Sequence, residues 1–317
     1  MDSKPHARSS GPLNNTTSIG DVFEVTVGDC SDIYCLDIGL YDTAKYGAVY
    51  ILNTERPAVV DTGTGVNYDL LRKALDTVGI TPSDLEIIAL THVHLDHAGG
   101  AGLLAADCPN AEVYVHEIGA PHVIDPSQLV AGTKHVIGDL WGYHIEPEPV
   151  PETRIRTLGD GDTIDLGDRE LETLYAPGHA PHQVAFYDRA SDALFPGDAA
   201  GMWLPCPELL AVTTPPPNFD LERWLDTHET IRDVDAGTFL YPHFGPREAG
   251  NVIDEHERLL MTWVRDIEMK REELDDEAVI EYFLETSELS KSLGDPAGSV
   301  PAQFSVLGIL LYLDIPV

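Results

Sequence analysis

Positive charge is the scarcest property of this 317-residue chain. Lysine and arginine number 19 against 54 aspartate and glutamate residues, so the formal net charge is −35 at pH 7. Nucleic acid is excluded as an expected partner, because no basic stripe exists to displace counterions from phosphates. The acidic residues are spread from Asp21 to Asp314, whereas a docking face for a basic partner would cluster them. The lysines are Lys4, Lys45, Lys73, Lys134, Lys270 and Lys291.

This excess of acidic residues predicts adaptation to concentrated salt. Unscreened charge of this size opposes a compact fold by self-repulsion, whereas molar salt shortens the Debye length to about 3 Å. We therefore expect a haloarchaeal, cytoplasmic protein whose surface carboxylates are screened by salt.

Long apolar segments and paired cysteines are also missing. The longest apolar run is FSVLGILLYL near the C-terminus, and its length of about ten residues is too short to span a membrane. Residues 1–18 lack the apolar core of a signal peptide and are expected to form a disordered tail. No C-x-x-C spacing exists, so we expect reduced thiols at Cys30, Cys35, Cys108 and Cys206.

Short strand-like segments alternate with helix-like segments along most of the chain. The helix candidates include residues 67–78 and 220–234, and the mixture predicts a layered α/β architecture. We expect one domain over residues 19–245 and a mainly helical extension over 246–317 packed on it, with an apolar stripe along residues 252–267. The strand candidates are VFEVTV, AVYIL, AVVDT, LEIIAL, EVYVH, ELETLYA, QVAFYD, ALFPG and TFLYP.

Residues 119–151 interrupt this alternation. Proline and glycine recur there together with Trp141, Tyr143 and His144, which predicts a long irregular insertion. Such a segment can form a wall or lid over a site, or it can be a plain surface excursion. The sequence leaves both interpretations open.

The segment 91–100, THVHLDHAGG, carries the clearest chemical signal. It follows the apolar run that ends at Leu90, so it is expected on a loop leaving a buried strand. In extended backbone His92 and His94 point to the same side, and Asp96 and His97 follow where the chain turns. Neutral imidazoles with a carboxylate are the ligands that zinc and similar metals prefer. The segment therefore predicts a metal site.

This H-x-H-x-D-H spacing resembles the signature of the metallo-β-lactamase superfamily of metal-dependent hydrolases. That family completes its site with a histidine, an aspartate and a histidine, each after a later strand. Matching residues occur in order: His179 in YAPGHAPHQ, Asp198 in ALFPGDAAG and His243 in TFLYPHFGP. The resemblance covers about residues 22–243 and implies a four-layer αββα sandwich.

The same resemblance implies a centre with two divalent metal ions, zinc first, with iron or manganese as alternatives. It assigns His92, His94 and His179 to the first ion. It assigns Asp96, His97 and His243 to the second ion, with Asp198 bridging both. Asp96 and Asp198 are accordingly the expected catalytic carboxylates, Asp96 by orienting the attacking water.

Two further residues are expected to support the ligands. Asp61 ends an apolar strand in VVDTG and is a candidate acceptor for a ligand histidine. His182, three residues after His179, is either such a partner or a surface residue. His116 is weighed as a pocket residue but favoured as structural.

A metal-bridging hydroxide that cleaves a small acyl ester is the expected chemistry, and a glyoxalase II-like hydroxyacyl thioester is the favoured substrate. A lactone or a phosphodiester is the alternative within the family. A diiron oxidoreductase and a non-catalytic metal-binding module are less favoured. The expected partner is a small molecule, with no membrane, and a homodimer is left open. Residues that could hold an anionic thiol cannot be assigned among Lys134, Arg154, Arg223 and Arg247.

Overall fold

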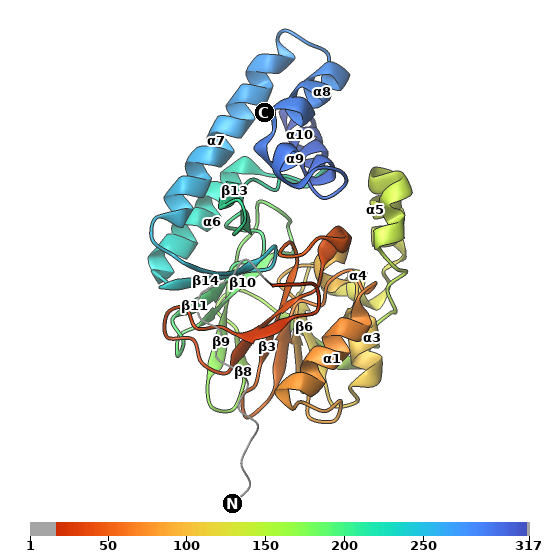
Figure 1. Ribbon diagram of the computed structural model, residues 1–317, viewed down its shortest axis with the longest axis vertical. Helices are drawn as coiled ribbons and strands as arrows, with labels where there is room; N and C mark the ends of the chain where they lie inside the picture. The colour runs from red at the N-terminus through yellow and green to blue at the C-terminus, as the bar shows by residue number, and fades with distance from the viewer. Residues whose placement is uncertain (1–16, 316–317) are drawn as a thin grey trace, which may run out of the picture.

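Two β-sheets packed face to face, with helices on both outer sides, form the body of the protein (Figure 1). The computed structural model describes residues 17–315, without the side chains of residues 139 and 140. The expected tail over residues 1–18 therefore lies almost entirely outside the described residues. None of the described helices combines the length and the apolar character that a membrane-spanning segment needs.

The first sheet has seven strands in the order β1-β2-β3-β4-β5-β6-β7. Pairing is antiparallel from β1 to β4 and parallel from β4 to β7. The parallel strands β4, β5 and β6 are short and largely buried, as expected for strands covered on both faces. The strands are β1 Val22–Glu24, β2 Ile33–Asp37, β3 Ala48–Leu52, β4 Ala58–Val60, β5 Ile87–Ala89, β6 Glu112–His116 and β7 Ile155–Leu158.

The second sheet has six strands in the order β15-β14-β11-β10-β9-β8. Only the β11–β14 pair is parallel within it. Its strands are β8 Thr163–Asp165, β9 Glu170–Tyr175, β10 Val184–Asp188, β11 Ala193–Phe195, β14 Thr238–Tyr241 and β15 Gly245–Glu248, and a separate hairpin is formed by β12 Met202–Leu204 and β13 Leu209–Ala211.

Side chains that alternate along the strands build the layers. In β3, Val49 and Ile51 pack into the core beneath the first layer of helices, whereas Tyr50 and Leu52 pack between the two sheets. In β10, Phe186 faces the first sheet and Tyr187 faces the opposite helices. These alternating faces produce the expected αββα order.

The helices cover the two outer faces. Helices α1 (Tyr68–Val78) and α3 (Ala101–Asp107) bury apolar side chains against the first sheet. Helices α6 (Leu221–Val234) and α7 (Val252–Arg271) pack on the second. Asp220 caps α6 by accepting a hydrogen bond from Arg223 N at 3.1 Å.

The C-terminal part is helical, as expected. Helices α7, α8 (Asp276–Thr286) and α10 (Ser299–Leu313) pack through a separate apolar cluster. Helix α9 (Glu288–Leu293) buries Leu289 in another cluster, with Tyr46 and Leu204. The last strand, β15, runs to Glu248, so the second sheet continues three residues past the expected domain end at 245.

The insertion over residues 119–151 differs from its prediction. It is mostly helical, with α4 (Ala120–Ile124), α5 (Ser127–Ile137) and a 3₁₀ segment at 138–143. Gly119, Pro121, Pro126 and Gly138 lie at the ends of these helices, where they delimit the helices and do not prevent them from forming, whereas Gly132 is accommodated inside α5. In Figure 1, α5 stands beside the sandwich and faces the C-terminal helices.

Candidate metal centre

The seven expected ligands come together where strands end. The motif residues follow β5, with Asp96 and His97 on the short helix α2 (Leu95–Ala98). His179 follows β9, Asp198 follows β11 and His243 follows β14. Four loops thus leave the two sheets at the same edge of the sandwich and direct their polar side chains to one place.

Three imidazoles converge at one side of the cluster. His92 Nε2 and His179 Nε2 each lie 3.0 Å from His94 Nδ1. Burial, followed by the neighbouring histidines, lowers the pKa of His92, and burial lowers that of His94 to about 3. Both rings are therefore neutral near pH 7, which is the form that binds metal.

The other side of the cluster combines imidazoles with carboxylates. His97 Nε2 lies 3.5 Å from Asp96 Oδ2 and 3.6 Å from Asp198 Oδ1. Asp198 Oδ2 lies 3.3 Å from His243 Nε2 and 3.4 Å from His179 Nε2. Asp198 therefore stands between the two halves of the cluster. The donor groups whose atoms lie within 4.8 Å of one another are His92–His94–His179, His92–His97–Asp198 and Asp96–His97–His243.

Unpaired buried atoms test whether metal ions fit here. His97 Nε2 and Asp198 Oδ1 are buried and have no hydrogen-bond partner among the described residues. A buried polar atom without a partner costs about 1–3 kcal/mol. Both atoms face the middle of the cluster, so a cation would satisfy them. The residues present fit a metal centre.

Electrostatics point the same way. Burial by itself lowers the pKa of His97, but the carboxylates of Asp96 and Asp198 and the hydrogen bond to Asp61 hold that pKa well above its usual value. Burial opposes ionisation of Asp198, yet the adjacent His243, His179 and His97 hold its pKa well below the usual range. Positive charge beside these carboxylates therefore stabilises their ionised form, and a proton or a metal ion can supply that charge.

Asp61 lies where an orienting acceptor is needed. His97 Nδ1 donates to Asp61 Oδ2 at 3.0 Å, which turns Nε2 toward the cluster. The same carboxylate accepts the backbone N–H of Thr91 at 2.9 Å and its hydroxyl at 2.9 Å. Asp61 has a left-handed φ of 59°, a strained conformation for a residue other than glycine.

Thr213 is a partner of the cluster that the sequence does not indicate. His179 Nδ1 donates to the Thr213 carbonyl oxygen at 2.8 Å. The Thr213 hydroxyl lies 2.7 Å from the same nitrogen and donates to Asp198 Oδ2 at 3.1 Å. One residue therefore orients two expected ligands. Since Thr213 sits 34 residues from His179 and 15 from Asp198, no local motif reveals it.

The other two histidines differ in their surroundings. His182 Nδ1 accepts from Val93 N at 3.4 Å, and its ring lies parallel to that of His92 with centroids 6.1 Å apart. It lines the cavity and makes no side-chain hydrogen bond to a ligand histidine. His116 stacks on Tyr175, with ring centroids 4.6 Å apart.

Tyr46 also lies at the centre and has no motif to mark it. Its ring is fully buried, with its centroid 5.8 Å from that of His243. Its hydroxyl has no hydrogen-bond partner in the described part of the chain. Such a phenol is available to donate to an oxygen of a bound molecule.

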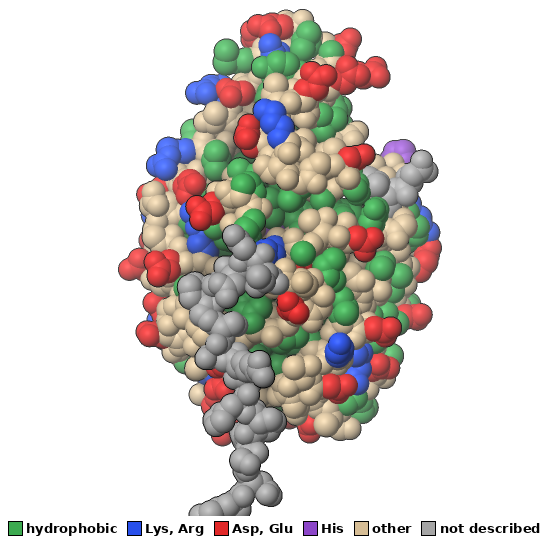
Figure 2. Space-filling view, in the orientation of Figure 1, with side chains coloured by type: hydrophobic (Ala, Val, Ile, Leu, Met, Phe, Trp, Pro, Cys, Tyr) green, Lys and Arg blue, Asp and Glu red, His purple; other side chains and the backbone are tan. Residues whose placement is uncertain are grey.

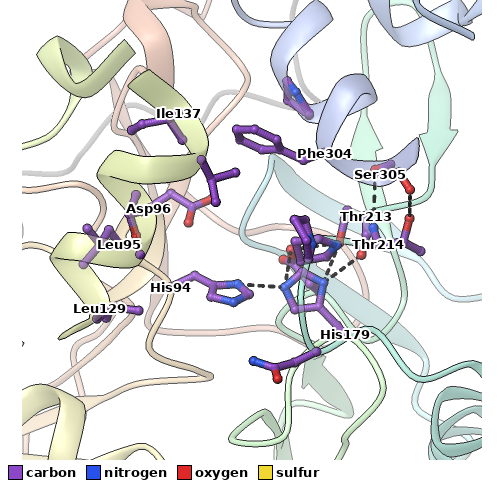
Figure 3. Close-up of a pocket in the computed structure, with 18 of the residues that line it drawn as sticks. His94, Leu95, Asp96, Leu129, Ile137, His179, Thr213, Thr214, Phe304 and Ser305 are labelled. Carbon is purple, nitrogen blue, oxygen red and sulfur yellow. Dashed lines mark hydrogen bonds and ion pairs between the residues drawn. The ribbon is translucent and has the colours of Figure 1, made fainter. Parts of the chain in front are cut away.

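A cavity of about 450 Å³ opens above the cluster (Figure 3). His94, Asp96, His179, Asp198 and His243 lie at its polar end. Its walls are mainly apolar, and Figure 2 shows hydrophobic side chains gathered between α5 and the C-terminal helices. Among the described residues, no lysine or arginine lines it. The wall residues from α5 and α10 include Leu129, Val136, Ile137, Pro301 and Phe304.

The four candidate anion-binding residues are engaged elsewhere. Lys134 pairs with Glu146, and Arg154 donates to the carbonyl oxygens of Ala105, Cys108 and Ala111. Arg223 lies 3.5 Å from Asp220, and Arg247 donates to Glu255 at 3.0 Å.

The sequence matches the family described as the metallo-beta-lactamase superfamily over residues 42–243. The chain belongs to this family. This membership agrees with the histidine and aspartate cluster described above and with the metal-dependent hydrolases that the motif resembles.

The chain is similar to two named relatives. It is 30% identical over 180 residues to the acyl-coenzyme A thioesterase MBLAC2 of Gallus gallus, covering 53% of this chain and 62% of that one. The chain thus spans less than two thirds of the length of this relative. It is also 22% identical over 241 residues to the metallo-beta-lactamase fold-containing protein ST1585 of Sulfurisphaera tokodaii, covering 74% and 85%.

Solved structures share the fold. The structure of ST1585 from Sulfolobus tokodaii superposes with a TM-score of 0.66 at 19% identity, covering 89% of this chain and 99% of that one. A beta-lactamase domain protein from Burkholderia ambifaria gives a TM-score of 0.68 at 18% identity, covering 95% and 90%.

Proposed function

We propose that this protein is a dinuclear metal-dependent hydrolase that cleaves acyl thioesters. The observation that carries the proposal is a cluster of seven donor residues, divided by Asp198 into two halves, at the foot of a mainly apolar cavity. A single tetrahedral ion takes four ligands, so seven exceed the need of one ion.

In this proposal His92, His94 and His179 would hold one ion, and Asp96, His97 and His243 would hold the other. The negative charge of Asp198, which stands beside both groups of residues, would offset the repulsion between the two ions. Zinc suits this set of nitrogen and oxygen donors, and iron or manganese fits it as well. Two such ions would polarise the substrate carbonyl and bring the pKa of a water near neutrality.

The protein's own groups orient the reactants. The Asp96 side chain is 27% exposed, so one side of this carboxylate is open to the cavity and can accept a hydrogen bond from the attacking water. The Tyr46 hydroxyl can donate to the substrate oxygen that gains negative charge. Asp61 and Thr213 hold His97, His179 and Asp198 in place for both tasks.

The thioester class rests on the relatives and on the cavity. MBLAC2 is named as an acyl-coenzyme A thioesterase, and the apolar walls suit an acyl chain. Since no described lysine or arginine lines the cavity, a negatively charged thiol portion of the substrate would lie outside it. This favours an aliphatic acyl group over the short hydroxyacyl group expected from the sequence. A lactone fits the same walls, whereas a phosphodiester would lack a basic partner.

A substrate panel in concentrated salt tests the proposal. We expect metal-loaded protein to hydrolyse aliphatic acyl thioesters faster than lactones and phosphodiesters, and chelator-treated protein to lose this activity. Preferred turnover of a phosphodiester, or equal turnover after metal removal, would contradict the proposal. Elemental analysis after native purification should give about two metal ions per chain, because the seven donors exceed one tetrahedral set, and one ion would count against the dinuclear arrangement.

A further inference from the structure

Helix α10 contributes to the cavity although it lies outside the segment that matches the family. The matched segment ends at residue 243, and α10 spans Ser299–Leu313. Pro301, Phe304 and Ser305 of this helix nevertheless line the cavity. Figure 3 shows Phe304 on the same side as Ile137 and above His179. The helix is therefore one wall of the cavity.

The same helix is bonded to the chain beside the metal centre. Thr214 Oγ1 donates to the Ser305 carbonyl oxygen at 2.7 Å, and Thr214 N donates to Ser305 Oγ at 3.3 Å. Ser305 Oγ in turn donates to the Val212 carbonyl oxygen at 3.3 Å. Thr214 is fully buried and Ser305 is 3% exposed, so water competes little for these bonds.

Gly308 brings the two backbones into direct contact. A Cβ atom on Gly308 would lie 1.9 Å from the Thr214 carbonyl oxygen and 2.9 Å from the Pro215 carbonyl carbon. Only a residue without a side chain allows this approach. The position of α10 is thereby fixed against residues 212–215.

Thr213 connects this contact to the ligands. It lies between Val212 and Thr214, which both bond to Ser305. Its carbonyl oxygen and hydroxyl orient His179 and Asp198. A displacement of α10 would shift Thr213, and a misplacement of about 1 Å at a catalytic group can reduce a rate a hundredfold.

From this geometry we propose that α10 is a specificity-determining and positioning element of the metal centre. Phe304 limits the length of the acyl chain that the cavity accepts. The hydrogen bonds between Thr214 and Ser305 hold Thr213 in position, and Thr213 in turn orients His179 and Asp198. The acyl identity of the ligand rests on the proposed function, whereas the positioning role does not.

Chain-length selectivity tests the role of Phe304. The probes are straight-chain carboxylates of four to twelve carbons, titrated calorimetrically into metal-loaded protein. Phe304→Ala should shift the preferred probe toward longer chains, with about tenfold tighter binding of the longest, because a deleted aromatic ring opens space for roughly two or more methylenes at ~0.8 kcal/mol each. Phe304→Trp should shift it toward shorter chains.

Gln303→Ala, on the exposed side of α10, is the matched control and should leave the profile unchanged. An identical profile in the wild type and both Phe304 variants would overturn the specificity role.

Metal affinity tests the positioning role. Thr214→Val keeps the shape of the side chain and removes its hydrogen bond to Ser305, so metal binding in competition with a chromophoric chelator should weaken by about tenfold. Thr214→Ser should restore it, because the hydroxyl is retained. Gly308→Ala should weaken it further if the variant folds, as circular dichroism would report.

Unchanged metal affinity in folded Thr214→Val would overturn the positioning role. These readouts need no turnover. If no thioester is hydrolysed while the probe profile and metal affinity respond as expected, the proposed function and the acyl identity of the ligand fail, whereas the chain-length selectivity at Phe304 and the positioning role stand.

Discussion

The two ends of the cavity are built by different principles. The polar end is supplied by loops that leave neighbouring strands, so its residues are fixed by the sandwich itself. The apolar walls come from α5 and α10, which lie beyond the sheets. We therefore expect changes at the polar end to abolish turnover, whereas changes in the walls should alter which substrate is preferred.

Asp198→Ala should have the largest effect of the changes at the polar end. The variant removes the carboxylate that stands between the two halves of the polar end, so the two cations of the proposed centre would repel each other without an intervening negative charge. We expect metal content to fall to one ion or none and turnover to drop by about a thousandfold or more. Elemental analysis and thioester hydrolysis measure both.

Asp226→Ala, on the exposed surface of α6, is the control and should behave as wild type. Retention of both ions and full turnover by Asp198→Ala would make Asp198 an ordinary turn residue.

Asp61→Asn should have the next largest effect. The amide places a donor where His97 Nδ1, Thr91 N and the Thr91 hydroxyl all need an acceptor. We expect metal affinity to weaken by about 10–100-fold, as for other groups that orient ligand histidines. Competition with a chelator measures it. Asp84→Asn breaks a similar pair of hydrogen bonds to Thr81 on the surface, and its metal affinity should not change.

Tyr46 and Tyr50 are both buried, but they differ in whether the hydroxyl has a hydrogen-bond partner. The Tyr46 hydroxyl has no described partner, so Tyr46→Phe should lower kcat by about tenfold with little loss of thermal stability. The buried Tyr50 hydroxyl donates to the Tyr241 carbonyl oxygen at 2.9 Å, so Tyr50→Phe should cost about 1 kcal/mol of stability and leave kcat unchanged. The opposite pattern would assign Tyr46 to packing alone.

The smallest expected effect is that of salt on thermal stability, through the acidic surface of the protein. With a net charge of −35, repulsion among carboxylates should weaken as salt is added. We expect the unfolding midpoint to rise by several degrees between 0.1 and 2 M KCl as this repulsion is screened. A sucrose series is the uncharged control. A flat or falling midpoint in KCl would count against adaptation to salt.

Much of the fold was predictable because its strands are short, apolar and separated by turns. The segments AVYIL, EVYVH and ELETLY became β3, β6 and β9. Strands such as β8 were missed, since a three-residue strand leaves almost no periodic signal. The helices of residues 119–151 were missed because the prediction relied on how many prolines and glycines occur there and not on where they lie relative to the helix ends.

The residues of the polar end could be proposed from the sequence, because the H-x-H-x-D-H motif resembles that of the metallo-β-lactamase superfamily and this resemblance implies His179, Asp198 and His243 as the further ligands. Each of these three residues follows a strand. The supporting residues of the site and the walls of the cavity depend on tertiary packing. Thr213 and Tyr46 reach the centre through contacts far apart in sequence. Helices α5 and α10 line the same cavity, although α5 ends at Ile137 and α10 begins at Ser299. Such contacts depend on how completed elements pack, which local pattern does not encode.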